Sequence, residues 1–306
     1  MRSDKLTTLR EAVAEHIGDG MVVALEGFGH LIPFAAGHEI IRQGRKDLTI
    51  CRMTPDIITD QLLAAGCVRK LVASFFASGS AGALFEIRRR VEDQDPEPLE
   101  VEEYSHYGMF TRYQAGAANV PFLPLRSYAG SDLPALNPQI RTVESPYGEG
   151  SVFVVPALTP DVTIIHAQRA DALGNVQLWG ITGAQQEAAY AADRVIVTVE
   201  EVVGTDVIRS DPNRTLVPAH AVDAVVHVPR GAHPSYAQGM YDRDSTFYRE
   251  WTAISRDKDK IREWIDVWVR GTQDHAELMT ALGDRWDGLA VASAPAGSVD
   301  YGRRMT

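Results

Sequence analysis

Residues 19–34, Asp-Gly-Met-Val-Val-Ala-Leu-Glu-Gly-Phe-Gly-His-Leu-Ile-Pro-Phe, decide the fold of this chain. A short apolar run at 21–25 leads directly into Gly-Phe-Gly at 27–29. An uninterrupted apolar run between glycines predicts a strand that is buried on both faces. The residues at 33–43 predict a helix that begins at a proline and ends at Gly44.

The turn between this strand and this helix is a candidate ligand site. In open α/β sheets, ligands bind beyond the carboxyl ends of the strands, which is where residues 27–30 are expected to lie. Glycines at such a position leave backbone N–H groups open to a ligand, and the helix N-terminus favours negative charge. A plain turn from strand to helix explains the same residues equally well, so this stretch alone leaves both interpretations open.

The pattern of strand, glycine-rich turn and helix continues along the chain. A capping box at Thr8 and Glu11 begins a first helix, and apolar runs at 48–52 and 70–76 predict two further buried strands, with a helix at 55–63 between them. Helices that alternate with short apolar strands indicate right-handed βαβ units. We therefore predict an α/β fold with an open, largely parallel sheet sandwiched by helices.

The sequence also suggests how the chain is divided. We predict one α/β domain over residues 1–240, in which residues 131–144 form a loop because prolines and asparagines interrupt them. From 241 to 285 apolar and tryptophan residues recur at helical spacing, which predicts a helical C-terminal extension packed on that domain. The Ala-, Ser- and Gly-rich residues 286–306 predict a mobile tail.

Composition excludes several kinds of partner. Of the 306 residues 45% are hydrophobic and 23% charged, which is ordinary for a globular protein with a substantial core. The net charge of -11 disfavours nucleic acid and anionic membranes as partners. No apolar run is long enough to span a bilayer, and Cys51 and Cys67 do not have metal-ligand spacing. We expect a cytoplasmic protein with no metal and no permanently bound cofactor.

The opening stretch resembles the glycine-rich signature of the A (alpha) subunits of family I coenzyme A transferases. That signature reads Asp-Gly, two residues, three apolar residues, Gly-Gly-Phe and then Gly-x-Pro. This chain departs from it at Glu26, which replaces the first glycine of the pair, and at Ile32-Pro33. A longer resemblance, from about residue 8 to 271, includes Arg-Met-Thr-Pro-Asp at 52–56 and Ala-Gly-Ser-Asp-Leu-Pro at 129–134. It is similar to the A subunits of glutaconate and 3-oxoadipate CoA-transferases.

The resemblance turns several loop residues into candidates for the site. It implies that Gly27, Phe28, Gly29 and His30 bind substrate, together with Ser78 and Ser80 in a second small-residue loop. Adjacent strand residues point to opposite faces, so only one of Glu102 and Glu103 can enter a site, and the resemblance favours Glu103. It implies catalytic roles for Glu103, Ser105 and His106.

The catalytic nucleophile of the family is missing from this chain. In the transferases that it resembles, a glutamate attacks the acyl-CoA thioester, and the family carries this glutamate in its B half within a Glu-Asn-Gly motif. The asparagines here stand at 119, 137, 175 and 213, and none lies between Glu and Gly. We therefore expect the A subunit of a hetero-oligomer, which moves CoA between an acyl-CoA and a small carboxylic acid together with a B subunit.

Two alternatives remain open at this stage. Two-subunit enzymes of steroid breakdown resemble this chain as well, and they hydrolyse a ring CoA thioester substrate instead of transferring CoA. In such an enzyme a side chain of the 103–106 loop would activate water or take a proton. A non-catalytic ligand-binding or scaffold subunit is an alternative of another class.

Overall fold

The structure, a computed structural model, describes residues 4–76, 82–148 and 150–291. Within these residues, nine strands form one large sheet and three form a small one. The large sheet contains β1 (Val22–Glu26), β2 (Leu48–Arg52), β3 (Val68–Ala73), β4 (Glu100–Glu103), β8 (Val162–Asp171), β9 (Val176–Gln177), β10 (Arg194–Val203), β11 (Thr215–Val217) and β12 (Ala224–His227). The α-helices are α1 (Leu9–His16), α2 (Phe34–Arg42), α3 (Ile57–Ala64), α4 (Phe85–Arg88), α5 (His106–Ala117), α6 (Leu133–Leu136), α7 (Gln185–Ala191), α8 (Thr205–Ser210), α9 (Ser245–Ser255), α10 (Lys258–Trp264) and α11 (His275–Ala281).

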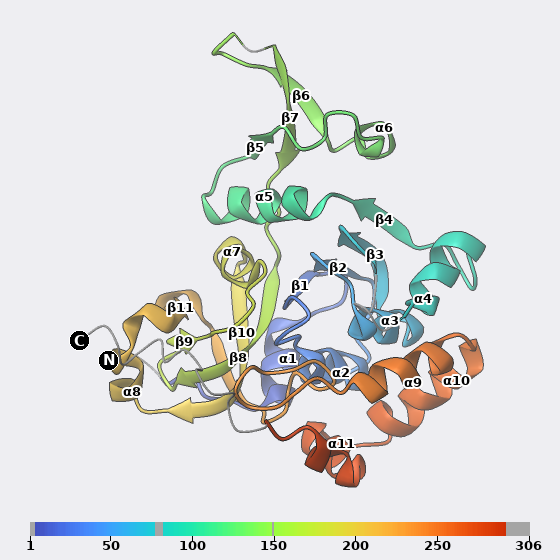
Figure 1. Ribbon diagram of the computed structural model, residues 1–306, viewed down its shortest axis with the longest axis vertical. Helices are drawn as coiled ribbons and strands as arrows, with labels where there is room; N and C mark the ends of the chain where they lie inside the picture. Colours follow the sequence, from blue (N-terminus) through green and yellow to red (C-terminus); the bar gives the residue numbers. More distant parts are fainter. Residues whose placement is uncertain (1–3, 77–81, 149, 292–306) are drawn as a thin grey trace.

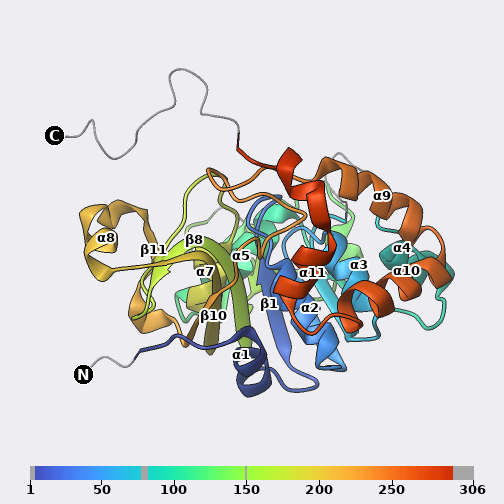
Figure 2. The same cartoon turned by 90° about the horizontal axis from the view of Figure 1, so that it is seen from below.

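The large sheet is mostly parallel. Its parallel strands follow the order β12-β10-β8-β1-β2-β3-β4, while β9 and β11 are joined antiparallel beside β8. Helices α5 and α7 lie on one face of this sheet and α1, α2 and α3 on the other (Figure 1). Viewed from below, α9, α10 and α11 lie outside α2 and α3 (Figure 2). The predicted α/β fold with a largely parallel sheet between helices is confirmed.

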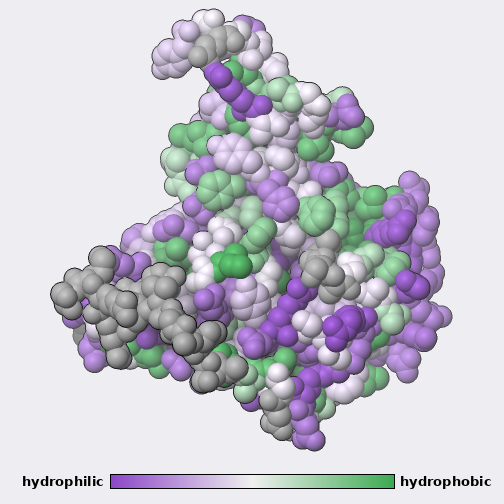
Figure 3. Space-filling model, in the orientation of Figure 1, coloured by the Kyte–Doolittle hydropathy of each residue, from purple (hydrophilic) through white to green (hydrophobic). Residues whose placement is uncertain are grey.

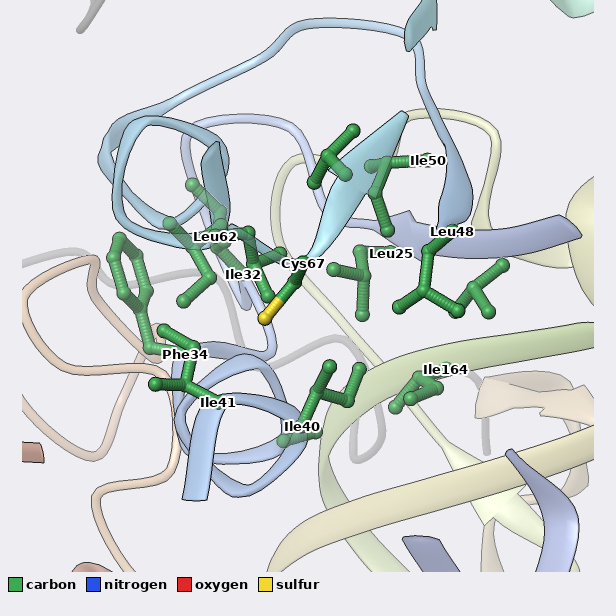
Figure 4. Packing of buried hydrophobic residues seen from close by; sticks show 14 of the residues in the cluster. Leu25, Ile32, Phe34, Ile40, Ile41, Leu48, Ile50, Leu62, Cys67 and Ile164 are labelled. Atoms are coloured by element: carbon green, nitrogen blue, oxygen red, sulfur yellow. The ribbon is translucent and has the colours of Figure 1, made fainter. Parts of the chain in front are cut away.

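Strand β1 is buried on both faces, as its apolar run predicts. Because side chains alternate along a strand, Val23 and Leu25 pack into the core beneath α2 and α3, whereas Ala24 packs toward α5. Figure 4 shows Leu25 among the isoleucines and leucines of that first core. The Glu26 side chain points to the same face of the sheet as Ala24, and this residue is 1% exposed. The end of β1 thus carries a buried acid toward α5.

A small antiparallel sheet projects from the main body. Strands β5 (Phe122–Leu125), β6 (Arg141–Glu144) and β7 (Ser151–Pro156) form it in the order β5-β7-β6, and Figure 1 shows the β6–β7 hairpin extending beyond α5. The prediction that residues 131–144 form only a loop is wrong, because this segment contains α6 and β6. The error arose because β6 is stabilised by β7, a partner strand that its own sequence does not indicate.

The segment after residue 241 forms helices that pack against the main body. The indole of the fully buried Trp251 in α9 donates a hydrogen bond to the Asp60 carboxylate in α3, over 3.2 Å. Residues 283–288 form a 3-10 helix, whereas the predicted tail from 292 onward lies outside the described residues. In the described residues, no helix has the length and apolar character needed to cross a membrane.

Candidate active site at the carboxyl edge of the sheet

Four neighbouring parallel strands place their following loops at one edge of the sheet. Strands β1, β2, β3 and β4 end at Glu26, Arg52, Ala73 and Glu103, respectively. Contacts around His106 show that these loops meet. The His106 ring lies 5.9 Å from the Phe28 ring and 6.0 Å from the Phe75 ring, measured between centroids. The structure therefore brings together the 27–30 and 103–106 segments that sequence analysis singled out separately.

The glycine-rich loop after β1 has two different requirements for glycine. A Cβ atom at Gly27 would lie 2.5 Å from the Leu31 carbonyl oxygen, so no side chain fits there. Gly29 has open space around it but a φ of +64°, which side chains disfavour. Among the described residues, no acceptor receives a hydrogen bond from the N–H groups of Phe28 or Gly29. These two groups are therefore available to a ligand.

His30 lies beneath the loop rather than on its open side. Its Nδ1–H donates to the Ile181 carbonyl over 3.0 Å, and its Nε2 accepts from the Gln238 N–H over 2.9 Å. Burial lowers the pKa of His30 to about 4, so the ring is neutral near pH 7. Both ring nitrogens are satisfied within the chain, which gives His30 the role of fixing the loop against residues 181 and 238.

The two glutamates at the end of β4 have opposite environments. Glu102 bonds to Lys70 (2.8 Å), Arg112 (2.7 Å) and the Tyr104 hydroxyl (2.6 Å). Burial raises its pKa, but the bonds to Lys70 and Tyr104 and the charge of Arg112 outweigh this and lower the pKa overall. Glu103 is exposed, and partial burial raises its pKa. Within the described residues, Glu103 is therefore the carboxylate of the pair that has no side-chain partner.

Ser105 is the N-cap of α5, and His106 is the first residue of this helix. The Ser105 hydroxyl accepts a hydrogen bond from the Gly108 N–H over 3.0 Å and so caps the helix. His106 is exposed, and partial desolvation lowers its pKa. Its Nε2 lies 2.9 Å from the Thr54 hydroxyl. Among the described residues, Thr54 is the hydrogen-bond partner of Nε2, and Nδ1 has none.

A groove of about 630 Å³ borders this site along the free edge of β4. It is lined by apolar side chains that include Ile87, Val101 and Leu136, and it reaches Glu103. The predicted substrate residues Ser78 and Ser80 lie outside the described residues. Sequence analysis missed Thr54 and Phe75, which the structure places against His106. The signal for Thr54 was present, since it belongs to the Arg-Met-Thr-Pro-Asp motif at 52–56.

The described residues contain no group of three His, Cys, Asp or Glu side chains that could hold a metal ion. Cys51 and Cys67 are both buried free thiols, and burial raises their pKa values to about 12 and about 11.

Comparison with known proteins identifies the family of this chain. The sequence profile of the coenzyme A transferase family matches residues 6–228, so the chain belongs to the coenzyme A transferase family. Within that family it is an A subunit of the heteromeric 3-oxoadipate and glutaconate type. Its relatives are subunits, which implies a B-subunit partner, and the family implies CoA thioesters as substrates.

Three relatives show how far the similarity extends. The chain is 51% identical to the A subunit of 3-oxoadipate CoA-transferase from Pseudomonas knackmussii, over 92% of this chain and 99% of that protein. It matches the crystal structure of glutaconate coenzyme A-transferase from Acidaminococcus fermentans with a TM-score of 0.88 and 32% identity, covering 94% and 96% of the two chains. It is 29% identical to the cholesterol ring-cleaving hydrolase IpdA subunit of Rhodococcus jostii, over 89% and 94% of the two chains.

Proposed function

We propose that this A subunit works with a B subunit to move CoA between an acyl-CoA and a dicarboxylic 3-oxo acid of the 3-oxoadipate type. The substrate class follows the relative of 51% identity, whose name specifies 3-oxoadipate. The observation that carries the proposal is an incomplete site, with two unused N–H donors and an imidazole at one edge but no Glu-Asn-Gly motif in the chain. The missing carboxylate nucleophile would come from the B subunit.

The chemistry assigns separate tasks to the two subunits. A B-subunit glutamate would attack the thioester carbonyl, forming an acyl-glutamyl anhydride and releasing CoA thiolate. The thiolate would then attack the glutamyl carbonyl, giving a glutamyl-CoA thioester and freeing the first acid. Each attack creates an oxyanion, and the N–H groups of Phe28 and Gly29 are suited to stabilise it. A neutral His106 with its proton on Nδ1 would donate a hydrogen bond to the bound acid.

The outer surface of the same edge is suited to the partner. Phe28, Phe75, Tyr107 and Ile181 are between 37% and 56% exposed, although all are large apolar side chains. A cluster of such residues around a site marks a protein interface, and closing it excludes the water that would weaken a carboxylate nucleophile. In Figure 3, apolar surface, drawn in green, continues along the flank where α5 and β5 lie in Figure 1.

We also assign the enzyme to the cytoplasm, since two buried free thiols suit a reducing compartment.

Product analysis of the assembled A–B complex tests the proposal. Given an acyl-CoA and labelled 3-oxoadipate, a transferase yields labelled 3-oxoadipyl-CoA without releasing free thiol. Release of free CoA thiol that does not require the acceptor acid would contradict transfer and establish hydrolysis.

Hydrolysis is the second candidate, because Glu103 is exposed with a raised pKa beside the groove, in a chain similar to a ring-cleaving hydrolase subunit. Full turnover by the isolated B subunit would support a scaffold role instead.

A further inference from the structure

Arg52, the last residue of β2, is completely buried next to the proposed site. Its Nε–H donates to the Thr54 carbonyl and one Nη2–H to the Gly27 carbonyl, both over 2.8 Å. An Nη1–H donates to the Leu25 carbonyl. A guanidinium is a planar fork with fixed donor directions, so it fixes these three carbonyls relative to one another.

Glu26 forms the reciprocal connection from the end of β1. Its Oε1 accepts from the Met53 N–H and from the Tyr113 hydroxyl, each over 2.9 Å. Burial raises the pKa of Glu26, and the charge of Arg52 opposes that rise. Each strand end therefore reaches across to the loop that follows the other strand. Glu26 is also the residue at which this chain departs from the glycine-rich signature.

We propose that Arg52 is a positioning residue for the transfer reaction, aligning the Phe28 N–H with His106. The peptide bond between Gly27 and Phe28 is planar, so its C=O and N–H point in opposite directions. Anchoring the Gly27 carbonyl on Arg52 therefore turns the Phe28 N–H away from Arg52. The same guanidinium holds the backbone of Thr54, whose hydroxyl lies against His106. One side chain thus sets the relative position of the oxyanion donor and the imidazole.

Arg42 provides a matched control. It is also a mostly buried arginine that binds several backbone carbonyls, with its Nε–H on Val269 and Thr272 at 2.9 and 3.1 Å. These contacts join α2 to the C-terminal helices and do not involve the candidate site. A purely structural role for both arginines predicts that lysine substitution has the same kind of effect at either position.

The experiment compares Arg52→Lys and Arg42→Lys in the assembled A–B complex. Lysine keeps the charge but has one ammonium group in place of the fork, so it cannot hold three carbonyls in place. We expect Arg52→Lys to lower kcat by about 100-fold with little change in KM, the signature of a lost transition-state interaction. Arg42→Lys should lower Tm and leave kcat of the folded complex unchanged. Equal kcat in the two folded variants would overturn the proposal.

A second measurement does not depend on transfer activity, which matters because the proposal rests on the proposed function of the complex. The A subunit is prepared with 13C-labelled histidine, and the His106 Cε1–H signal is titrated in the complex. Arg52→Lys should shift the pKa that this titration gives for His106, and Arg42→Lys should not. Of the two arginines, only Arg52 holds the backbone of Thr54. An unshifted titration in Arg52→Lys overturns the positioning role. A wild-type complex that transfers no CoA overturns the proposed function, and the titration still decides the role of Arg52.

Discussion

The Thr54 hydroxyl and the His106 Nε2 lie 2.9 Å apart, joining the loop after β2 to the first turn of α5. The two residues are far apart in sequence and meet only because β1 to β4 are adjacent and parallel. This contact engages Nε2 of His106, so Nδ1 is the nitrogen that the proposed mechanism uses. It also makes His106 the residue at which transfer and hydrolysis can best be separated.

His106→Ala distinguishes the two catalytic functions. If the enzyme transfers CoA, the variant should bind the acid more weakly while the acyl-enzyme step with CoA ester stays partly intact. If it hydrolyses, His106 or Glu103 is the general base, and His106→Ala or Glu103→Gln should lower the rate by about 100- to 10,000-fold. Single-turnover kinetics of the complex with acyl-CoA, run beside a thermal melt, measure both. A lower Tm with unchanged kinetics in the folded protein would contradict both catalytic roles.

The two loop glycines should respond differently to substitution. Gly27→Ala should lower Tm and activity together, because its Cβ would lie 2.5 Å from the Leu31 carbonyl oxygen. Gly29→Asn should keep Tm close to wild type, since asparagine tolerates a φ of +64° and the space there is open. A lower kcat in this variant would show that the ligand occupies the space above Gly29. Melts and steady-state kinetics of both variants check this, and a stable Gly27→Ala complex would contradict the packing argument.

A charge on the apolar rim should prevent assembly with the B subunit. Tyr107 is 56% exposed beside His106, so Tyr107→Glu would place a carboxylate in an interface that excludes water. Val267→Glu is the matched control, since Val267 is 57% exposed on the 265–270 turn of the C-terminal helices. Size-exclusion chromatography of each variant with the B subunit should show loss of the complex for Tyr107→Glu only. Normal assembly of Tyr107→Glu with the B subunit would show that this edge is not part of the interface.

Asp60 should make stability depend on pH. Burial raises the pKa of Asp60 to about 7, even though it accepts hydrogen bonds from the Ile87 N–H and the Trp251 indole. The folded state therefore binds a proton that the unfolded state has released above about pH 4. The contribution of Asp60 to the free energy of unfolding is present at low pH and is lost as the pH rises through about 7.

Asp60→Asn removes this titration and keeps an amide oxygen as an acceptor. Relative to wild type, the variant should gain up to about 1.4 kcal/mol in the free energy of unfolding for each pH unit between about 4 and 7. Urea unfolding of both proteins at several pH values measures the difference. A difference that does not change with pH would show that Asp60 stays ionised in the folded protein.

The sequence by itself determined the succession of strands and helices along the first part of the chain. Short apolar runs, glycine-rich turns and helical spacing are local patterns, and they placed β1, α2 and β2 to within about two residues. It also showed that the chain lacks the nucleophile of its family, because an absent motif is read directly from the residues. The same patterns placed residues 27–30 beyond the carboxyl end of a strand, where open α/β sheets bind ligands.

Only the tertiary structure decided what each side chain in those loops does. His30 follows the glycines like a ligand-facing residue, yet contacts with residues 181 and 238 bury it and occupy both its nitrogens. Ser105 caps a helix, and Arg52 reaches the carbonyls of Leu25 in β1 and Gly27 just after it. The strand β6 was missed for the same reason. Local patterns record which face of an element is buried, whereas hydrogen-bond partners depend on which distant segments the folded chain brings into contact.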